Sequence, residues 1–465
     1  MFGLETGLLL LLIFCLLAAC AFEFVNGFHD TANAVATVIY TNSLQPWTAV
    51  IWSGICNFAG VMLGGISVAM GIVNLLPVEM LIDQNVWHSA AMVLALLFSA
   101  IIWNLGTWYY GLPSSSSHTL IGSILGVGLA FSFMPEHQSG EAVNWDKASE
   151  IGLSLLVSPL FGFTMSLLLM FLLRRFVKDP RLFREPPQKK APPAWIRGVL
   201  ITTCTLVSFF HGSNDGQKGV GLIMLILISI VPIAFALDNR LESSALQNSV
   251  SQIEQTIGRI NVAGLPPESR GNLQLAAAQA DSVQTILAAS GGNIPREQRL
   301  TVRRDILLIS REIKAATTSP PATIPPADLA ALRDAAGNLR QYTDYAPRWV
   351  IVIVSLSLGL GTMVGWKRIV KTVGEKIGKQ HLTYAQGASA ELVAASTIGL
   401  ASGLGLPVST THVLSSGIAG SMVASGGVGN IQPRTVRSIA LAWLLTLPVS
   451  ITLAALLYFF FRWVF

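Results

Sequence analysis

Ten long apolar runs fill most of the chain, and they leave few folds open to it. Hydrophobic residues make up 52% of the 465 residues and charged residues 12%, whereas soluble domains carry about a quarter charged residues. A helix crosses a bilayer with about 20 apolar residues, so each run is close to one span. The pattern predicts an all-α polytopic membrane protein. The runs lie near residues 7–40, 47–76, 88–111, 114–134, 150–173, 198–237, 347–366, 381–405, 408–428 and 438–461.

Basic residues set the expected orientation of these runs. No Lys or Arg precedes Lys147, whereas 174–197 holds eight basic and two acidic residues. Because Lys and Arg accumulate on the cytoplasmic side, this segment and the basic loop 367–379 are expected inside, and the N-terminus outside. The two halves then enter the membrane from opposite sides, which predicts two inverted repeats of about five spans each. Because the basic residues are placed in these loops, the net charge of +5 gives no support for nucleic-acid binding.

A hydrophilic segment, 238–346, interrupts the second half with 11 basic and 11 acidic residues. Its Ala-, Leu- and Gln-rich stretches are separated by Pro and Gly pairs, which predicts three or four helices. We expect an inserted helical extramembrane domain on the external side. The predicted order is a first membrane repeat at 1–173, a cytoplasmic linker at 174–197, the start of the second repeat at 198–237, the insert at 238–346 and the remainder of the second repeat at 347–465.

The first run of each half contains a carboxylate at membrane depth. Gly27-Phe28-His29-Asp30-Thr31-Ala32-Asn33 in the first half corresponds to Gly212-Ser213-Asn214-Asp215-Gly216-Gln217-Lys218 in the second. Ionisable groups inside a membrane are costly and indicate function, although polar bonding between helices is an alternative. Both runs exceed one straight span, so broken or re-entrant helices are expected at 26–33 and 208–218.

A second pair of matched motifs lies later in each half. Leu112-Pro113-Ser114-Ser115-Ser116-Ser117-His118 corresponds to Leu406-Pro407-Val408-Ser409-Thr410-Thr411-His412. A Pro near a helix start, followed by hydroxyl residues, predicts a capped helix N-terminus. Free N–H groups, the helix dipole and hydroxyl donors together favour an oxyanion, and ordinary capping is the alternative. Carboxylates beside such a site require an anion that arrives with cations or with protons, or that is itself protonated, which favours phosphate over sulfate.

Two other classes of protein share parts of this pattern. An intramembrane hydrolase would use Ser and His, but here these residues are neighbours in sequence without the setting of a catalytic nucleophile. The sequence also contains no H-E-x-x-H zinc motif, so we predict that the protein is not an enzyme. A passive anion channel is the stronger alternative, because broken helices can line a pore. Carboxylates on the pathway argue against a channel.

The two Asp motifs and the two Pro…His motifs resemble those of the inorganic phosphate transporter (PiT) family, and the sequences around Asp30 and Asp215 resemble its bacterial low-affinity Pit subgroup. The resemblance extends over nearly all membrane segments. It implies a secondary active transporter that imports phosphate, as a multi-pass protein of the bacterial cytoplasmic (inner) membrane, with a homodimer left open. We expect alternating access about a site between the two halves as the mechanism. The substrate-binding residues expected from the resemblance and the matched motifs are Asp30, Asn33, Asp215, Lys218, Ser115, Ser116, Ser117, Thr119, Ser409, Thr410 and Thr411.

The second Asp motif departs from the sodium-coupled members of the family, which are similar in carrying Asn in both copies. Here Asn33 corresponds to Lys218, whose ammonium cannot coordinate a cation. We therefore expect proton symport, and sodium coupling is the alternative. The resemblance to the Pit subgroup also implies proton coupling, commonly with a neutral complex of phosphate and a divalent metal as the transported species. No cofactor is expected, and no residues are assigned to a metal. Candidates for the coupling role are polar residues in or beside apolar runs, namely Glu23, His29, His118, His211, Asn214, Glu391 and His412.

Overall fold

The chain folds into helices grouped in two compact units. The computed structural model describes residues 4–76, 85–134, 143–187, 190–238, 240–318 and 324–465, without the side chains of 31–33. One unit, which we call the membrane unit, comprises Leu10–Pro77, Trp87–Leu225 and Ala346–Phe465, and the other is formed mainly by Ile226–Tyr345. Among the described residues, β structure is limited to one isolated bridge between Gly378 and Ile431.

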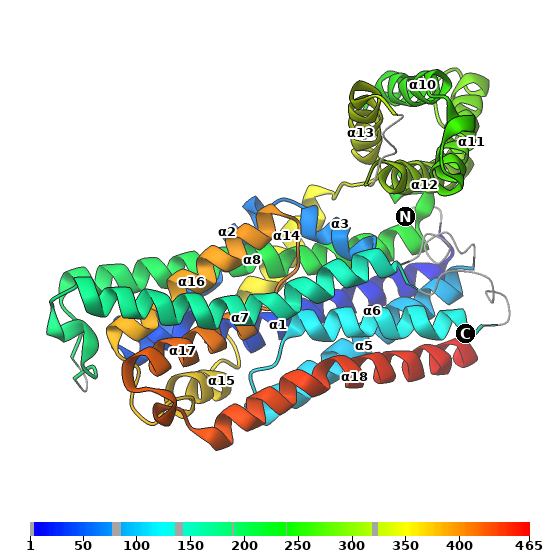
Figure 1. Cartoon of the computed structure of the whole chain (residues 1–465). Coiled ribbons are helices and arrows are strands. Elements are labelled where there is room, and N and C mark those ends of the chain that lie inside the picture. Colours follow the sequence, from blue (N-terminus) through cyan, green and yellow to red (C-terminus); the bar gives the residue numbers. More distant parts are fainter. Residues whose placement is uncertain (1–3, 77–84, 135–142, 188–189, 239, 319–323) are drawn as a thin grey trace. The chain divides into compact units, whose positions relative to one another are not determined.

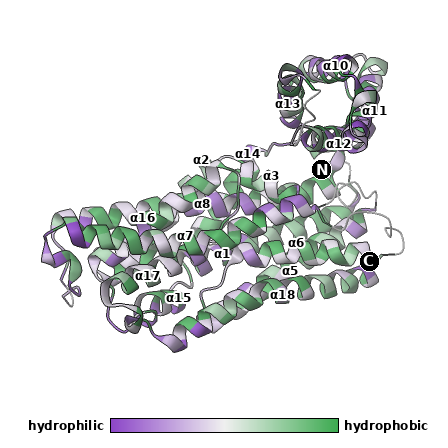
Figure 2. Ribbon diagram, in the orientation of Figure 1, coloured by the Kyte–Doolittle hydropathy of each residue, from purple (hydrophilic) through white to green (hydrophobic). Residues whose placement is uncertain are grey.

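The helices of the membrane unit follow the apolar runs of the sequence (Figures 1 and 2). In a bilayer every backbone polar group must be satisfied within the protein, and a helix does so within one segment. These helices are α1 (Thr6–Tyr40), α2 (Pro46–Leu63), α3 (Ser67–Val73), α5 (Val86–Tyr109), α6 (Ser116–Ser132), α7 (Trp145–Phe176), α8 (Ala194–Ile230), α14 (Arg348–Thr362), α15 (Lys367–Lys371), α16 (Tyr384–Gly403), α17 (Thr410–Gly426) and α18 (Pro433–Val464).

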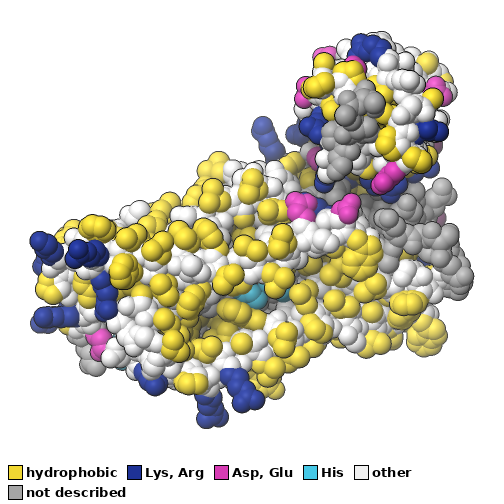
Figure 3. All heavy atoms as spheres, in the orientation of Figure 1, with side chains coloured by type: hydrophobic (Ala, Val, Ile, Leu, Met, Phe, Trp, Pro, Cys, Tyr) yellow, Lys and Arg dark blue, Asp and Glu magenta, His cyan; other side chains and the backbone are white. Residues whose placement is uncertain are grey.

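Apolar side chains lie exposed along the outer surface of α7 and α18. Leu156 and Leu160 on α7 are 74% and 68% exposed, and Leu444 and Trp463 on α18 are 72% and 83% exposed. Figure 3 shows hydrophobic side chains spread over the face in view, with Lys and Arg side chains gathered toward one end of the membrane unit. A continuous apolar surface of this kind is suited to lipid contact and not to water.

Fewer helices meet the length and composition of a full span than the ten that we expected. Among the described residues, six do so, namely α1, α2, α5, α7, α8 and α18. A seventh is obtained if α14 and the helical stretch Lys367–Lys376 count as one span with a bend of 53°. The two hydroxyl-rich motifs instead begin helices of only 17 residues, α6 and α17, which are too short to cross about 30 Å of hydrocarbon.

The expectation of broken helices in the two Asp motifs is wrong. α1 runs without a break over 35 residues and α8 over 37. The motif glycines serve close helix contacts and not breaks, since a Cβ at Gly27 would lie 2.9 Å from the Thr362 backbone nitrogen, and one at Gly212 would lie 2.8 Å from Asn57 Cα. Neither polar segment contains Pro, so the backbone hydrogen bonds of each helix are retained.

Helices of the two halves exchange partners in the membrane unit. The short helix α6 packs along α18, and its counterpart α17 packs along α7, while α2 packs against α14. Glycines allow both close approaches: a Cβ at Gly126 would lie 2.8 Å from the Ile451 carbonyl carbon, and one at Gly420 would lie 3.0 Å from that of Phe163. Each hydroxyl-rich helix start is therefore held by the long last helix of the other half.

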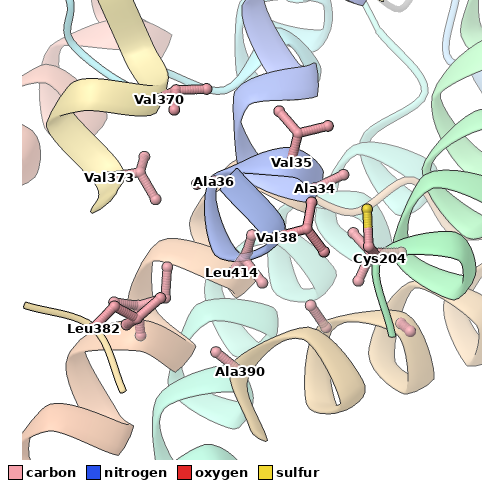
Figure 4. Packing of buried hydrophobic residues seen from close by; sticks show 14 of the residues in the cluster. Ala34, Val35, Ala36, Val38, Cys204, Val370, Val373, Leu382, Ala390 and Leu414 are labelled. Atoms are coloured by element: carbon pink, nitrogen blue, oxygen red, sulfur yellow. The ribbon is translucent and has the colours of Figure 1, made fainter. Parts of the chain in front are cut away.

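A buried apolar cluster surrounds the C-terminal part of α1 (Figure 4). Val35 and Val38 of α1 pack there with Cys204 of α8 and Leu414 of α17. Small residues such as Ala390 of α16 let the helices approach closely, as is common in membrane helix packing. The cluster fixes α1, α8, α16 and α17 relative to one another directly beside the polar motifs.

In the described residues of the second unit, four helices of 15 to 23 residues surround an apolar core, and the short helix α9 (Pro232–Phe235) precedes them. They are α10 (Ser243–Arg259), α11 (Pro267–Ala289), α12 (Arg299–Thr318) and α13 (Pro326–Arg340). The Pro pairs of the sequence mark the starts of α11 and α13, where a missing N–H costs nothing. The Arg303 guanidinium is buried and donates to the carbonyls of Ala236 and Thr343, which lie near the two ends of the unit's main segment.

Candidate functional site

Asp30 lies on α1 and is only 2% exposed. Both of its carboxylate oxygens accept a hydroxyl hydrogen: Ser116 Oγ donates to Oδ2 over 2.7 Å, and Thr411 Oγ1 donates to Oδ1 over 2.5 Å. Ser116 begins α6 and Thr411 is the second residue of α17. The structure thus brings the two matched hydroxyl-rich helix starts, which are 295 residues apart in sequence, to one buried carboxylate.

The starts of α6 and α17 are capped in the same way. Ser115 Oγ accepts from the backbone N–H of His118 over 3.2 Å, and Ser409 Oγ accepts from that of His412 over 3.1 Å. Capping by a side-chain oxygen satisfies one of the free N–H groups of a helix start and leaves others available. Ser115 and Ser409 therefore shape the helix ends, while the residues that follow them point donors toward Asp30.

The prolines before these starts are also held in matched fashion. Trp443 Nε1 on α18 donates to the Pro113 carbonyl over 2.9 Å. In the other half, Ser154 Oγ on α7 donates to the Pro407 carbonyl over 3.3 Å. Both bonds come from the long last helix of the opposite half, so a shift of either long helix would move a hydroxyl-rich helix start.

Asp215, the counterpart of Asp30, is fully buried on α8 and pairs with a Lys of its own motif. Lys218 Nζ lies 2.7 Å from Asp215 Oδ1 and donates to Ser117 Oγ over 2.5 Å. Ser117 Oγ in turn donates to the Val408 carbonyl over 2.7 Å. Ser116 Oγ lies 3.4 Å from Asp215 Oδ2, so this hydroxyl reaches both carboxylates.

The charges at this site do not cancel when Asp30, Asp215 and Lys218 are all ionised. Two carboxylates and one ammonium leave a formal charge of −1 among groups that are almost wholly buried. Burying charge costs several kcal/mol per ion unless partners compensate, and among the described side chains the partners of Asp30 within hydrogen-bond distance are hydroxyls and an imidazole. With these three groups ionised, the site carries one negative charge without a fixed partner of opposite charge.

His211 presents one ring nitrogen toward the carboxylates. The Thr362 hydroxyl donates to the Leu358 carbonyl and accepts from Asn57 Nδ2, so Asn57 Oδ1 is left to accept from His211 Nδ1 over 2.8 Å. His211 Nε2 lies 3.6 Å from Asp215 Oδ2, and in the neutral imidazole this nitrogen carries the lone pair. Ligand atoms of Asp30, His211 and Asp215 lie within 4.8 Å of one another, close enough to hold one metal ion.

The remaining residues of the expected binding set have other surroundings. Thr119 Oγ1 donates to the Ser115 carbonyl within α6, and Thr410 is buried at the first position of α17. The side chain of Asn33 lies outside the described residues. Asn214, expected among the coupling residues, instead holds the turn before α17: its amide donates to the Leu406 carbonyl and accepts from the Val408 N–H.

Three further expected coupling histidines differ in what they contact. His29 Nδ1 is 3.2 Å from Asp30 Oδ1, and its Nε2 is 3.2 Å from Thr107 Oγ1. His412 stacks on Trp443 with ring centroids 3.9 Å apart, and its ring lies 4.5 Å from that of His118. Of these histidines, only His29 touches a motif carboxylate directly.

Both expected coupling glutamates are fully buried. Glu23 on α1 accepts a 3.4 Å bond from Asn26 Nδ2. Glu391 on α16 accepts a 2.5 Å bond from Thr203 Oγ1 on α8. Each carboxyl therefore contacts a polar side chain at membrane depth. In the described residues, neither glutamate shares a hydrogen bond with Asp30 or Asp215.

Sequence reasoning missed several residues that position the site. Asn57 and Thr362 orient His211, Thr107 contacts His29, and Trp443 holds the Pro113 carbonyl. Asn57 alone carried a detectable signal, because an Asn inside an apolar run needs a polar partner. Thr and Trp are ordinary residues of membrane helices, so only the fold identifies their contacts.

The chain is similar to known proteins over nearly its whole length. The model of the Phosphate transporter family matches residues 26–454. The low-affinity inorganic phosphate transporter PitA of Escherichia coli (strain K12) is 42% identical over 489 aligned positions, which cover 98% of this chain and 97% of that protein. A probable low-affinity inorganic phosphate transporter of Bacillus subtilis (strain 168) is 29% identical and covers 98% of this chain and 99% of its own length.

A solved structure named as the sodium-dependent phosphate transporter has the same fold, with a TM-score of 0.55 and 21% identity. The match covers 98% of this chain and all of that one. The residues matched by the family model include both Asp motifs and both hydroxyl-rich helix starts, and the match begins within α1 at residue 26. The chain therefore belongs to the phosphate transporter family.

Proposed function

We propose that this protein imports inorganic phosphate across the cytoplasmic membrane of a bacterium by proton symport. The observation that carries the proposal is the convergence of Ser116 and Thr411, from two matched helix starts, on the buried carboxylate of Asp30. Hydroxyl and backbone N–H donors at helix starts are the groups that bind phosphate oxygens. The names of the relatives, which are all those of phosphate transporters, support phosphate as the substrate.

Competition for donors links phosphate binding to a cation. Ser116 and Thr411 each have one hydroxyl hydrogen, and both hydrogens are directed to Asp30. Phosphate that binds at the helix starts takes these hydrogens, so the Asp30 carboxylate loses its two hydroxyl donors and keeps the contact with His29 Nδ1. A buried carboxylate that loses these two donors is unfavourable by several kcal/mol, and uptake of a proton by one of the buried carboxyl groups of the site, or of another cation, offsets that cost. Phosphate and cation therefore bind together.

Lys218 favours a proton over sodium as that cation. Its ammonium lies 2.7 Å from Asp215 Oδ1, where a sodium ion would otherwise need oxygen ligands. The same ammonium can pair with a phosphate oxygen, because it already donates to Ser117 at the start of α6. If sodium were the coupled ion, it would have to bind without oxygen ligands from the Asp215–Lys218 part of the second motif.

A divalent metal that accompanies phosphate has a place in this proposal. Asp30, His211 and Asp215 would be its protein ligands, since their ligand atoms lie within 4.8 Å of one another. A divalent cation and a phosphate dianion together are neutral, so such a pair leaves the formal charge of the site unchanged. The metal would be part of the transported substrate.

Alternating access about this site is the proposed mode of transport. The exchanged packing of α6 on α18 and of α17 on α7 supports two repeats that move against each other. The long helices hold the prolines before both helix starts, so rocking of one repeat would shift the donors around Asp30.

Uptake by proteoliposomes tests the proposal. We expect the purified protein to accumulate labelled phosphate above equilibrium when a proton gradient is imposed without sodium. A passive channel would only dissipate a phosphate gradient, and a sodium symporter would need sodium. Asp30→Asn and Asp215→Asn are each expected to abolish accumulation while the protein still inserts into the membrane. Normal accumulation by either variant would remove that Asp from the essential site.

A further inference from the structure

Glu23 is the buried carboxyl with the fewest hydrogen bonds near the site. Its Oε2 accepts one long bond of 3.4 Å from Asn26, and its Oε1 has no hydrogen-bond partner among the described residues. The residue lies seven positions before Asp30 on α1, which is about 10 Å along the helix axis. A carboxyl so poorly satisfied in a membrane helix is costly, and helix packing alone gives no reason for it.

Gly219 on α8 provides the space in which this carboxyl lies. A Cβ at position 219 would be 2.5 Å from Glu23 Cδ and 2.7 Å from Oε1, well inside contact distance. Because Gly219 directly follows Lys218, the carboxyl lies against the backbone next to the Lys218–Asp215 ion pair. Glu23 and Gly219 therefore form a matched side chain and socket beside the site.

The other repeat has neither the acid nor the socket. The spacing that aligns Asp30 with Asp215 also aligns Glu23 with Ser208 and Gly219 with Ala34. Ser208 Oγ makes an ordinary 2.8 Å hydrogen bond with Ser53 Oγ. A small hydroxyl is thus sufficient at this position in α8, so the Glu is not a requirement of the shared helix packing.

Charged and titratable groups face Glu23 from two helices. Lys218 and Asp215 lie one and four positions before Gly219 on α8, and Cys20 and Asp30 lie three positions before and seven positions after Glu23 on α1. Lys218 favours the ionised carboxyl and the two aspartates favour the protonated one. A phosphate dianion that pairs with Lys218 removes the one favourable charge, so phosphate binding and proton binding at Glu23 favour each other.

We propose that Glu23, seated against Gly219, binds the proton that is transported with phosphate. This inference rests on the proposed proton symport. The carboxylate takes up a proton from the outside when phosphate neutralises Lys218. The same carboxyl releases the proton to the inside after phosphate has left, because the Lys218 charge is then restored.

The first test separates proton-driven accumulation from phosphate exchange. Full-length Glu23→Gln protein in proteoliposomes should exchange internal and external phosphate at equal pH within about threefold of the unchanged protein, because the amide imitates the protonated acid. Its accumulation under a proton gradient should fall at least about tenfold, which corresponds to 1.4 kcal/mol or more. Glu375→Gln, which makes the same change at an exposed position, is the control and should alter neither.

A second pair of variants tests the socket without removing the acid. Gly219→Ala should shift the pH dependence of uptake, because the added Cβ displaces the Glu23 carboxyl. Adding Glu23→Asp, whose side chain is one methylene shorter, should restore the original pH dependence in the double variant. A merely structural role for Glu23 predicts lower protein yield or stability, with an unchanged pH dependence.

Three results would overturn the inference while leaving proton symport intact. They are unchanged accumulation by Glu23→Gln, an unchanged pH dependence in Gly219→Ala, and a shifted pH dependence that Glu23→Asp does not restore. If Glu23→Gln also lost exchange, the restored pH dependence of the double variant would still support the inference. Failure of the unchanged protein to accumulate phosphate under a proton gradient would instead contradict the proposed function.

Discussion

The two motif aspartates differ in what offsets their charge. Asp215 has a permanent partner in the Lys218 ammonium at 2.7 Å, whereas Asp30 depends on the hydroxyls of Ser116 and Thr411. An ammonium stays in place when phosphate arrives, but a hydroxyl hydrogen can be redirected. The two copies of the motif therefore differ in how readily each carboxylate would lose its partners under the proposed phosphate binding.

Thr411→Val is expected to weaken phosphate binding. A hydrogen bond to a charged group contributes about 1.5–3 kcal/mol, so the KM for phosphate uptake should rise roughly tenfold to a hundredfold. The matched control is Thr397→Val on α16, because Thr397 Oγ1 donates only to the Val393 carbonyl of its own helix. An equal KM in the two variants would show that Thr411 does not serve phosphate.

Lys218→Asn makes the second motif resemble the first at this position. Loss of the ammonium removes the partner of Asp215 and the donor to Ser117. We expect the proton dependence of uptake to weaken, measured as the ratio of initial rates at two external pH values. A ratio equal to that of the unchanged protein would refute the assigned role of Lys218.

The sequence identified the chemical groups of the site better than their contacts. Asp30, Ser116 and Thr411 could be selected because their motifs occur twice, and the repeated pattern links segments far apart in the chain. Nothing in the sequence indicates that the two hydroxyl-rich starts meet at Asp30 and not at Asp215. That choice depends on how the helices pack, which is a property of the whole unit.

At the scale of single helices, the polar motifs are carried by unbroken elements. α1 and α8 remain helical through the segments where breaks were expected. The polar side chains find partners on neighbouring helices, so the backbone keeps its own hydrogen bonds. Sequence hydropathy marks where a membrane helix carries polar groups, but it does not distinguish a broken helix from a straight helix with a polar face.

Gly420→Ile should loosen the contact between α17 and α7. A Cβ at Gly420 would lie 3.0 Å from the Phe163 carbonyl carbon, so a branched side chain must push the two helices apart. We expect lower thermal stability in detergent. Overpacking costs about 1–3 kcal/mol, so the melting temperature should fall by roughly several degrees. Gly152→Ile on α7 is the control, since that position has no atom within 4 Å of a new Cβ. Equal melting temperatures would contradict the packing described for α17.

Across the whole molecule, the two halves of the membrane unit are interlocked and not merely adjacent. α6 packs on α18, and α17 packs on α7. The long helices α18 and α7 each donate a hydrogen bond to the proline carbonyl that precedes the hydroxyl-rich helix start of the other half. Movement of one half must therefore change the donors that the other half presents to Asp30. Under the proposed alternating access, a change in access would therefore also change the donors around Asp30.

Simultaneous recording of phosphate uptake and internal pH in sodium-free proteoliposomes tests proton coupling most directly. An inward phosphate gradient alone should acidify the interior as phosphate enters, because each transport cycle carries protons with the anion. The acidification should disappear in Asp30→Asn, which should take up no phosphate. Phosphate uptake that leaves the internal pH unchanged, or that occurs only when sodium is added, would contradict proton symport.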